Sequence, residues 1–82
     1  MGETRPVFLD IQEGDKITYR TPEMSEVDMP LQGLVWGKSQ RILRDNNGWY
    51  SLETTYLVED SNGRQARWIN AERILRYVRT WL

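Results

Sequence analysis

Residues 45–50, Asp45-Asn46-Asn47-Gly48-Trp49-Tyr50, carry the strongest structural signal in this sequence. An Asn-Gly pair readily supplies the positive φ angles that the central residues of a tight hairpin turn require. Two strands should therefore flank this turn and pair in antiparallel fashion.

The residues on both sides of the turn alternate as strands do. One face of the strand predicted over residues 49–58 is the more apolar and should point inward; it holds Tyr50, Leu52, Thr54, Tyr56 and Val58. The strand before the turn starts near Gly33, and its alternation predicts that Leu34 and Trp36 point inward. Gly37 within that strand indicates a bulge or a close backbone approach.

Two further turns extend this pattern. Asp60-Ser61-Asn62-Gly63 predicts a second hairpin, with a returning strand over residues 64–69 whose inner face carries Ala66 and Trp68. Upstream, Glu13-Gly14-Asp15 is typical of a turn, and the strand after it places Ile17 and Tyr19 on one face. Residues 22–30 contain two prolines and three acidic residues, which predicts an acidic loop.

The two ends of the chain leave alternatives open. Residues 1–12 form either a loosely attached arm or an extra edge strand. From residue 71 the apolar residues fall in one helical stripe, which favours a helix or at least a helical turn capped by Asn70. A short turn followed by a final strand is the alternative.

Composition excludes several chemistries. The chain has 82 residues, 39% of them hydrophobic and 28% charged, which indicates one globular domain. It contains neither cysteine nor histidine, so disulfides, thiol or histidine catalysis and zinc sites of the usual kind are impossible. No apolar run is long enough for a signal peptide or a membrane span, so a cytoplasmic protein is expected. No phosphate-binding or serine-elbow motif is present, and we expect neither an enzyme nor a cofactor.

Several short motifs occur in the order seen in SH3-like barrels. They are Glu13-Gly14-Asp15-Lys16-Ile17, the acidic loop, Gly33-Leu34-Val35, Gly48-Trp49-Tyr50 and Trp68-Ile69-Asn70-Ala71-Glu72-Arg73-Ile74. Over about residues 13–78 the chain resembles that family, which implies a small antiparallel barrel of about five strands with a C-terminal helical turn or short helix. The family's ALYDY-type aromatic motif is missing, and Asn70 stands where those domains usually have proline. The resemblance therefore supports the fold more than polyproline binding. We expect a mainly β protein with an arm at residues 1–12 and a single domain at residues 13–82.

The candidate contact residues are aromatic and charged. Four tryptophans are too many for a core of this size, and the resemblance implies that Trp49 lies on the ligand-facing surface. Tyr50 and Tyr19 could complete an aromatic groove beside it. The arginines at or near the two hairpins could form a positive rim; they are Arg41, Arg44, Arg64 and Arg67. Three acidic loop residues could face a basic partner: Glu23, Glu26 and Asp28. Their spacing matches no cation-binding loop, so no metal site is expected.

These features predict a non-catalytic interaction module that binds a macromolecular partner, most readily a protein, as a small adaptor or inhibitor does. Trp, Tyr and Arg are the residues that dominate interface energetics. A nucleic-acid-binding barrel is the first alternative, although the pI of about 5.4 is low for such a module. A structural subunit of a homo-oligomer is the second, and the oligomeric state itself stays open.

Overall fold

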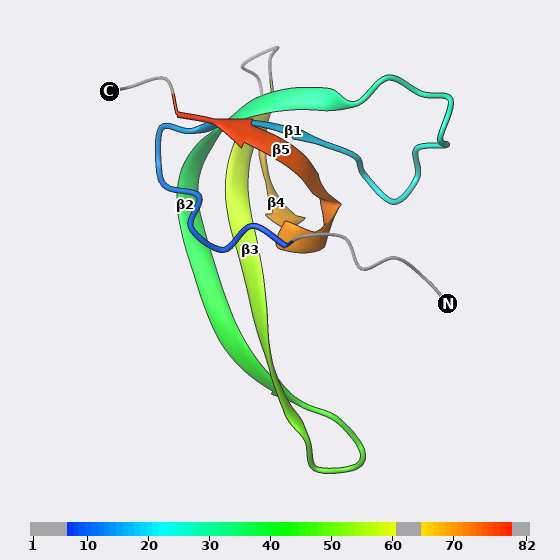
Figure 1. Ribbon diagram of the computed structural model, residues 1–82, viewed down its shortest axis with the longest axis vertical. Helices are drawn as coiled ribbons and strands as arrows, with labels where there is room; N and C mark the ends of the chain where they lie inside the picture. The colour runs from blue at the N-terminus through cyan, green and yellow to red at the C-terminus, as the bar shows by residue number, and fades with distance from the viewer. Residues whose placement is uncertain (1–6, 61–64, 80–82) are drawn as a thin grey trace.

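The computed structural model describes residues 7–60 and 65–79 as a single, strongly bent antiparallel sheet (Figure 1). Its five strands lie in the order β4-β3-β2-β1-β5. In chain order the elements are β1 (Lys16–Tyr19), β2 (Leu31–Arg44), β3 (Tyr50–Asp60), β4 (Ala66–Asn70), the 3-10 turn η1 (Ala71–Arg73) and β5 (Ile74–Val78). The predicted mainly β fold of five strands is therefore confirmed.

The sheet does not close into the predicted barrel. β4 and β5 are its two edges, and within the described residues each pairs with only one neighbour, β3 and β1 respectively. The concave side is covered instead by the segment that precedes β1. Ile11 of that segment is fully buried, Phe8 packs against the core, and the Tyr56 hydroxyl donates to the Phe8 carbonyl at 3.0 Å. Figure 1 shows this segment crossing in front of β2 and β3.

The favoured C-terminal helix is wrong beyond its first turn, and the turn-plus-strand alternative is right. The Asn70 side chain caps η1 as predicted, accepting a hydrogen bond from the Glu72 backbone N–H at 3.0 Å. The chain then extends as β5, in which Ile74 pairs with Tyr19 and Val78 with Lys16. Pairing with β1 buries Ile74 in the core, and that tertiary contact outweighs the local helical pattern.

The core holds nine buried apolar side chains contributed by the pre-β1 segment, all five strands and η1: Ile11, Ile17, Tyr19, Val35, Tyr56, Val58, Ile69, Ala71 and Ile74. The predicted inward faces of β1 and of the inner half of β3 are confirmed by this set. The predicted inward positions of Trp36 and Trp68 are wrong, because both side chains are more than half exposed.

A bulge explains the position of Trp36. The ladder that starts at the hairpin turn pairs Lys38 with Tyr56 and Gly37 with Leu57, but it then pairs Val35 with Val58. Trp36 is the extra residue between these pairs. Without a bulge, Trp36 would face Val58 and point inward; the one-residue shift turns Val35 inward and Trp36 outward.

The first hairpin turn lies where predicted, although its geometry differs. The Gly48 N–H donates to the Asp45 carbonyl at 3.1 Å, and the Asp45 N–H donates to the Trp49 carbonyl at 3.0 Å. Among the described non-glycine residues none has a positive φ, whereas Gly48 has a φ of 84°. The turn therefore uses a single left-handed glycine at its end rather than positive φ at both Asn47 and Gly48. Of the second predicted turn, Asp60-Ser61-Asn62-Gly63, all but Asp60 lies outside the described residues, while the antiparallel pairing of β3 with β4 is present.

Candidate functional site

The outer halves of β2 and β3 form a two-stranded ribbon, residues 39–55, that projects from the body of the molecule (Figure 1). The ladder of β3 with β4 ends at Thr55, and the ladder of β2 with β1 ends at Leu34. Beyond these points neither strand of the ribbon has another neighbour within the described residues. A two-stranded hairpin is at best marginally stable alone in water, so the ribbon gains most from a binding partner.

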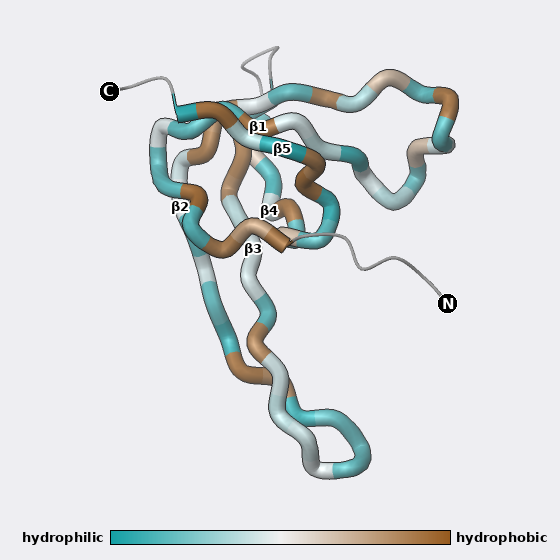
Figure 2. The backbone as a smooth tube through the Cα atoms, in the orientation of Figure 1, coloured by the Kyte–Doolittle hydropathy of each residue, from teal (hydrophilic) through white to brown (hydrophobic). Residues whose placement is uncertain are grey.

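Exposed apolar side chains gather on this ribbon. Ile42 is 71% exposed and Leu52, its cross-strand partner, 55%. At the tip, residues 44–50, Trp49 is 75% exposed and Tyr50 67%. Figure 2 shows the apolar stretches of the two strands at the same height along the ribbon. More than half of each of these side chains remains in contact with water in the single chain, so most of their apolar surface is left for an interface to bury.

The charged groups of the ribbon are paired with their neighbours. Arg41 Nε donates to Glu53 Oε1 at 2.7 Å, and the Arg44 guanidinium lies over the Tyr50 ring at 5.6 Å from its centroid. One Asp45 carboxylate oxygen accepts from the backbone N–H groups of Asn47 and Trp49, each at 2.9 Å. The turn is thereby held in shape, and Trp49 is presented on a defined backbone.

A hollow of about 180 Å³ lies where the ribbon meets the body. Val7 and Leu9 line one side, Leu43 and Leu52 of the ribbon another, and Ala71 and Glu72 of η1 a third. We call it the base hollow. Polar residues complete its wall, among them Ser51, Thr54 and Asn70.

A second exposed apolar group lies on the convex face of the sheet. Trp68 pairs with Leu57, and Trp36 bulges out beside Gly37, which pairs with the same Leu57. The sequence pattern did not identify these two indoles as surface residues. For Trp68 a signal was available, because a hairpin closed by Asn62-Gly63 alone, as the sequence permits, would set Leu57, and not the inward Tyr56, opposite it.

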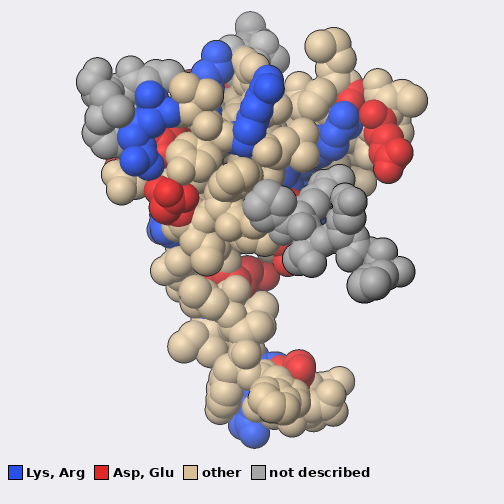
Figure 3. All heavy atoms as spheres, in the orientation of Figure 1, with Lys and Arg blue, Asp and Glu red and all other residues tan. Residues whose placement is uncertain are grey.

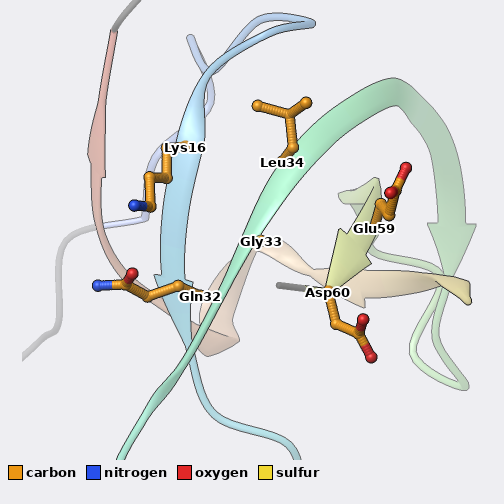
Figure 4. Close-up of a pocket in the computed structure, with 6 residues that line it drawn as sticks. All are labelled: Lys16, Gln32, Gly33, Leu34, Glu59 and Asp60. Atoms are coloured by element: carbon orange, nitrogen blue, oxygen red, sulfur yellow. The ribbon is translucent and has the colours of Figure 1, made fainter. Parts of the chain in front are cut away.

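Another hollow, of about 250 Å³, lies on the sheet near Gly33 (Figure 4). A Cβ on Gly33 would stand 2.4 Å from Val58 Cγ1, so only glycine allows β2 to cross β3 this closely. Lys16, Glu59 and Asp60 line the hollow, but Figure 4 shows the two carboxylates pointing away from the lysine amine. The arrangement does not converge on a point where a substrate could react.

The predicted contact residues are not on one surface. Trp49, Tyr50, Arg41 and Arg44 lie together on the ribbon. Arg67 lies on β4 opposite Val58, five positions along β3 from Glu53, the partner of Arg41. Arg64 lies outside the described residues. The predicted arginine rim is therefore divided between ribbon and body.

Tyr19 is not available for contact, which corrects its assignment to the aromatic groove. Its side chain is fully buried because Tyr19 points inward with Ile17 from β1, which is flanked by β2 and β5. Burial raises the pKa of its phenol, an effect larger than the opposing influence of Arg67.

The acidic loop residues, Glu23, Glu26 and Asp28, are exposed at the end of the molecule away from the ribbon tip (Figure 1). The loop is held by Arg20, whose Nη1 donates to the carbonyls of Ser25 at 2.9 Å and Asp28 at 2.7 Å. A partner that contacts the ribbon tip would therefore need a second, separate surface to reach these carboxylates.

Two other kinds of site were sought in the part of the chain that the structure describes. No three acidic side chains gather there as a bound metal ion would need. No helix in the same ranges is long and apolar enough to cross a membrane.

Comparison of the chain with models of known protein families, with curated proteins and with solved structures finds no match. Its function is therefore inferred from the geometry of the molecule.

Proposed function

We propose that the chain is a non-catalytic protein-interaction module whose contact surface is the ribbon, residues 39–55. One observation carries this proposal: large apolar side chains are exposed on a two-stranded projection that pairs with no further strand among residues 7–60 and 65–79. Ile42, Trp49, Tyr50 and Leu52 are each more than half exposed. Leaving them in water forgoes roughly 25 cal/mol per Å² of apolar surface, which a partner would recover.

The chemistry of the tip supports a protein partner. Tryptophan and tyrosine bury much area at little conformational cost, and interface energies concentrate on them and on arginine. The ribbon carries two basic residues, Arg41 and Arg44, and two acidic ones, Asp45 and Glu53. Its charge is thus balanced, whereas a surface for nucleic acid needs an excess of positive charge to neutralise phosphates.

We also propose that the fold is an opened relative of the SH3-like barrels. The support is the arrangement of its elements. A turn containing Gly14 and Asp15 precedes β1, a long loop joins β1 to β2, and a 3-10 turn precedes the last strand, which pairs with the first. The open edge between β4 and β5 is the departure from a closed barrel.

A capture experiment tests the proposed interface. The chain is immobilised and exposed to native lysate with and without nuclease, and the retained proteins are quantified against Trp49→Ala. A central tryptophan contributes about 2 kcal/mol or more, so retention should fall by roughly thirtyfold or more. The thermal midpoint, measured at low protein concentration so that association does not contribute, should stay nearly unchanged, because Trp49 is not part of the core.

Trp68→Ala is the matched control, since it removes an indole of comparable exposure from the convex face. Equal loss of partners in both variants would contradict the assignment to the ribbon. Retention that disappears on nuclease treatment would favour the nucleic-acid alternative. A large fall in the thermal midpoint of Trp49→Ala would show that the indole is structural.

A further inference from the structure

We propose that the partner is a second copy of this chain, and that the two copies exchange their ribbons, each seating its tip in the other's base hollow. This inference rests on the proposed function, because it names the partner of the same ribbon. Two complementary features of one chain carry it: a protruding aromatic tip, and a hollow at the foot of the same ribbon whose wall is part apolar and part polar.

The size and lining of the hollow fit an aromatic side chain. Its volume is about 180 Å³. An apolar protein cavity of about 150 Å³ is large enough to bind benzene. Val7 and Leu9 are each almost half exposed at its wall, so an incoming indole from Trp49 would cover apolar surface that now faces water.

Charge matches between the tip and the hollow. Arg44 is the basic group of the tip, and the carboxylate of Asp45 beside it is already engaged by the backbone of the turn. Glu72 is the exposed acidic residue at the wall of the hollow. The Arg44 guanidinium of one copy can therefore form a charge-assisted pair with the Glu72 carboxylate of the other.

Symmetry makes the two contacts occur together. In a two-fold dimer a patch that contacts a second patch is contacted by it in return, so each tip can occupy the opposite hollow. The ribbons would then lie antiparallel along each other, with the faces that carry Ile42 and Leu52 in contact. On the face seen in Figure 3 the ribbon shows little charge between the body and the tip, and Arg41 is paired with Glu53, so this approach meets little charge repulsion.

Sedimentation equilibrium over a range of concentrations tests the proposal. The full chain should form dimers. Arg44→Glu and Glu72→Arg should each weaken dimerisation at least roughly tenfold, because each places like charges at both symmetric contacts. The double variant should recover most of the affinity of the natural chain, since it restores opposite charges in the reversed sense. Trp49→Ala should weaken dimerisation at least roughly thirtyfold.

Glu23→Arg serves as the control, because it reverses a charge on the loop at the other end of the molecule and should leave dimerisation unchanged. Single variants that dimerise like the natural chain, or a double variant weaker than both, would overturn the exchange. A monomeric natural chain would also overturn it. If that monomer still captures a Trp49-dependent protein from lysate, the interaction module stands with a different partner; if it captures none, both proposals fail.

Discussion

β2 and β3 have two different environments along their length: one end lies in the core and the other is exposed to solvent. The comparison separates the residues that stabilise the fold from those that are available for contact with a partner. In the body, Val35 and Val58 face each other and are almost wholly buried. In the ribbon, Ile42 and Leu52 face each other in the same ladder and are mostly exposed. Strand pairing does not explain the difference, because the ladder is unbroken in the ribbon and carries its one register shift, at Trp36, in the body. The difference is a second layer: only the body has β1, β5 and the pre-β1 segment over its inner face.

The body also contains a polar clasp that the ribbon lacks. Asp15 is fully buried and accepts hydrogen bonds from Arg79 Nε and Nη2, each at 3.1 Å, and from the Gln12 N–H at 2.9 Å. Arg79 Nη2 also donates to the Asp10 carbonyl at 3.1 Å. The clasp ties the residue after β5 to the segment before β1, and thus joins the two ends of the described chain.

The sharpest test compares two isoleucines. Ile17→Ala should lower the free energy of unfolding by about 3 kcal/mol, because it leaves a cavity among fully buried neighbours. Ile42→Ala should lower it by less than about 0.5 kcal/mol, because that side chain is exposed. Urea unfolding at low protein concentration measures both. Equal losses would show that the ribbon packs as tightly as the body.

Two carboxylates make the next comparison. Asp15→Asn should lower the free energy of unfolding by about 2 kcal/mol, because the amide cannot accept all the hydrogen bonds that the buried carboxylate receives. Glu53→Gln should cost less than about 1 kcal/mol, because its partner Arg41 is largely exposed to water. Chemical denaturation of the two variants checks the difference, and a costly Glu53→Gln would argue against a solvated ribbon.

Removing the hydroxyl should have different effects on stability at two buried tyrosines. Tyr56→Phe should lose about 1 kcal/mol, because its hydroxyl donates to the Phe8 carbonyl. The Tyr19 hydroxyl is buried without a hydrogen-bond partner among the described residues, so Tyr19→Phe should be neutral or slightly stabilising. Thermal unfolding of the two variants distinguishes them. Destabilisation by Tyr19→Phe would mean that this hydroxyl is satisfied.

The smallest expected effect is the contribution of these two phenols to the pH dependence of the free energy of unfolding. Burial raises the pKa of Tyr19 and Tyr56 above the usual value of about 10. A raised pKa stabilises the folded state fully below pH about 10, and that contribution is lost as the pH rises through the folded pKa. The double variant Tyr19→Phe, Tyr56→Phe should therefore lose less stability than the natural chain between pH 9 and roughly pH 11. An identical decline in both would assign alkaline unfolding to other groups.

The sequence predicted the strands better than their faces. The alternation around Tyr56 and Val58 and the Asn-Gly turn identified β3 and its hairpin, since both are local signals. The inward assignment of Trp36 failed because a bulge at the predicted Gly37 region reverses the face of every residue beyond it. Of the predicted contact residues, Trp49, Tyr50, Arg41 and Arg44 lie near one another because they flank one turn. Tyr19 was grouped with them by the resemblance to binding barrels and Arg67 by its place near the second hairpin, and neither signal reports a distance in the folded chain.

The amino-acid order alone determined where the chain turns, which segments extend and which chemistries are unavailable, because these depend on backbone preferences and residue types. The tertiary structure decided which indoles face water, that residues 74–78 add a strand to β1 instead of continuing a helix, and that the hairpin stands clear of the core. Those outcomes depend on contacts between segments far apart in the chain. A short-range sequence pattern is compatible with either face of a strand and with either a helix or a strand, so it could not decide them.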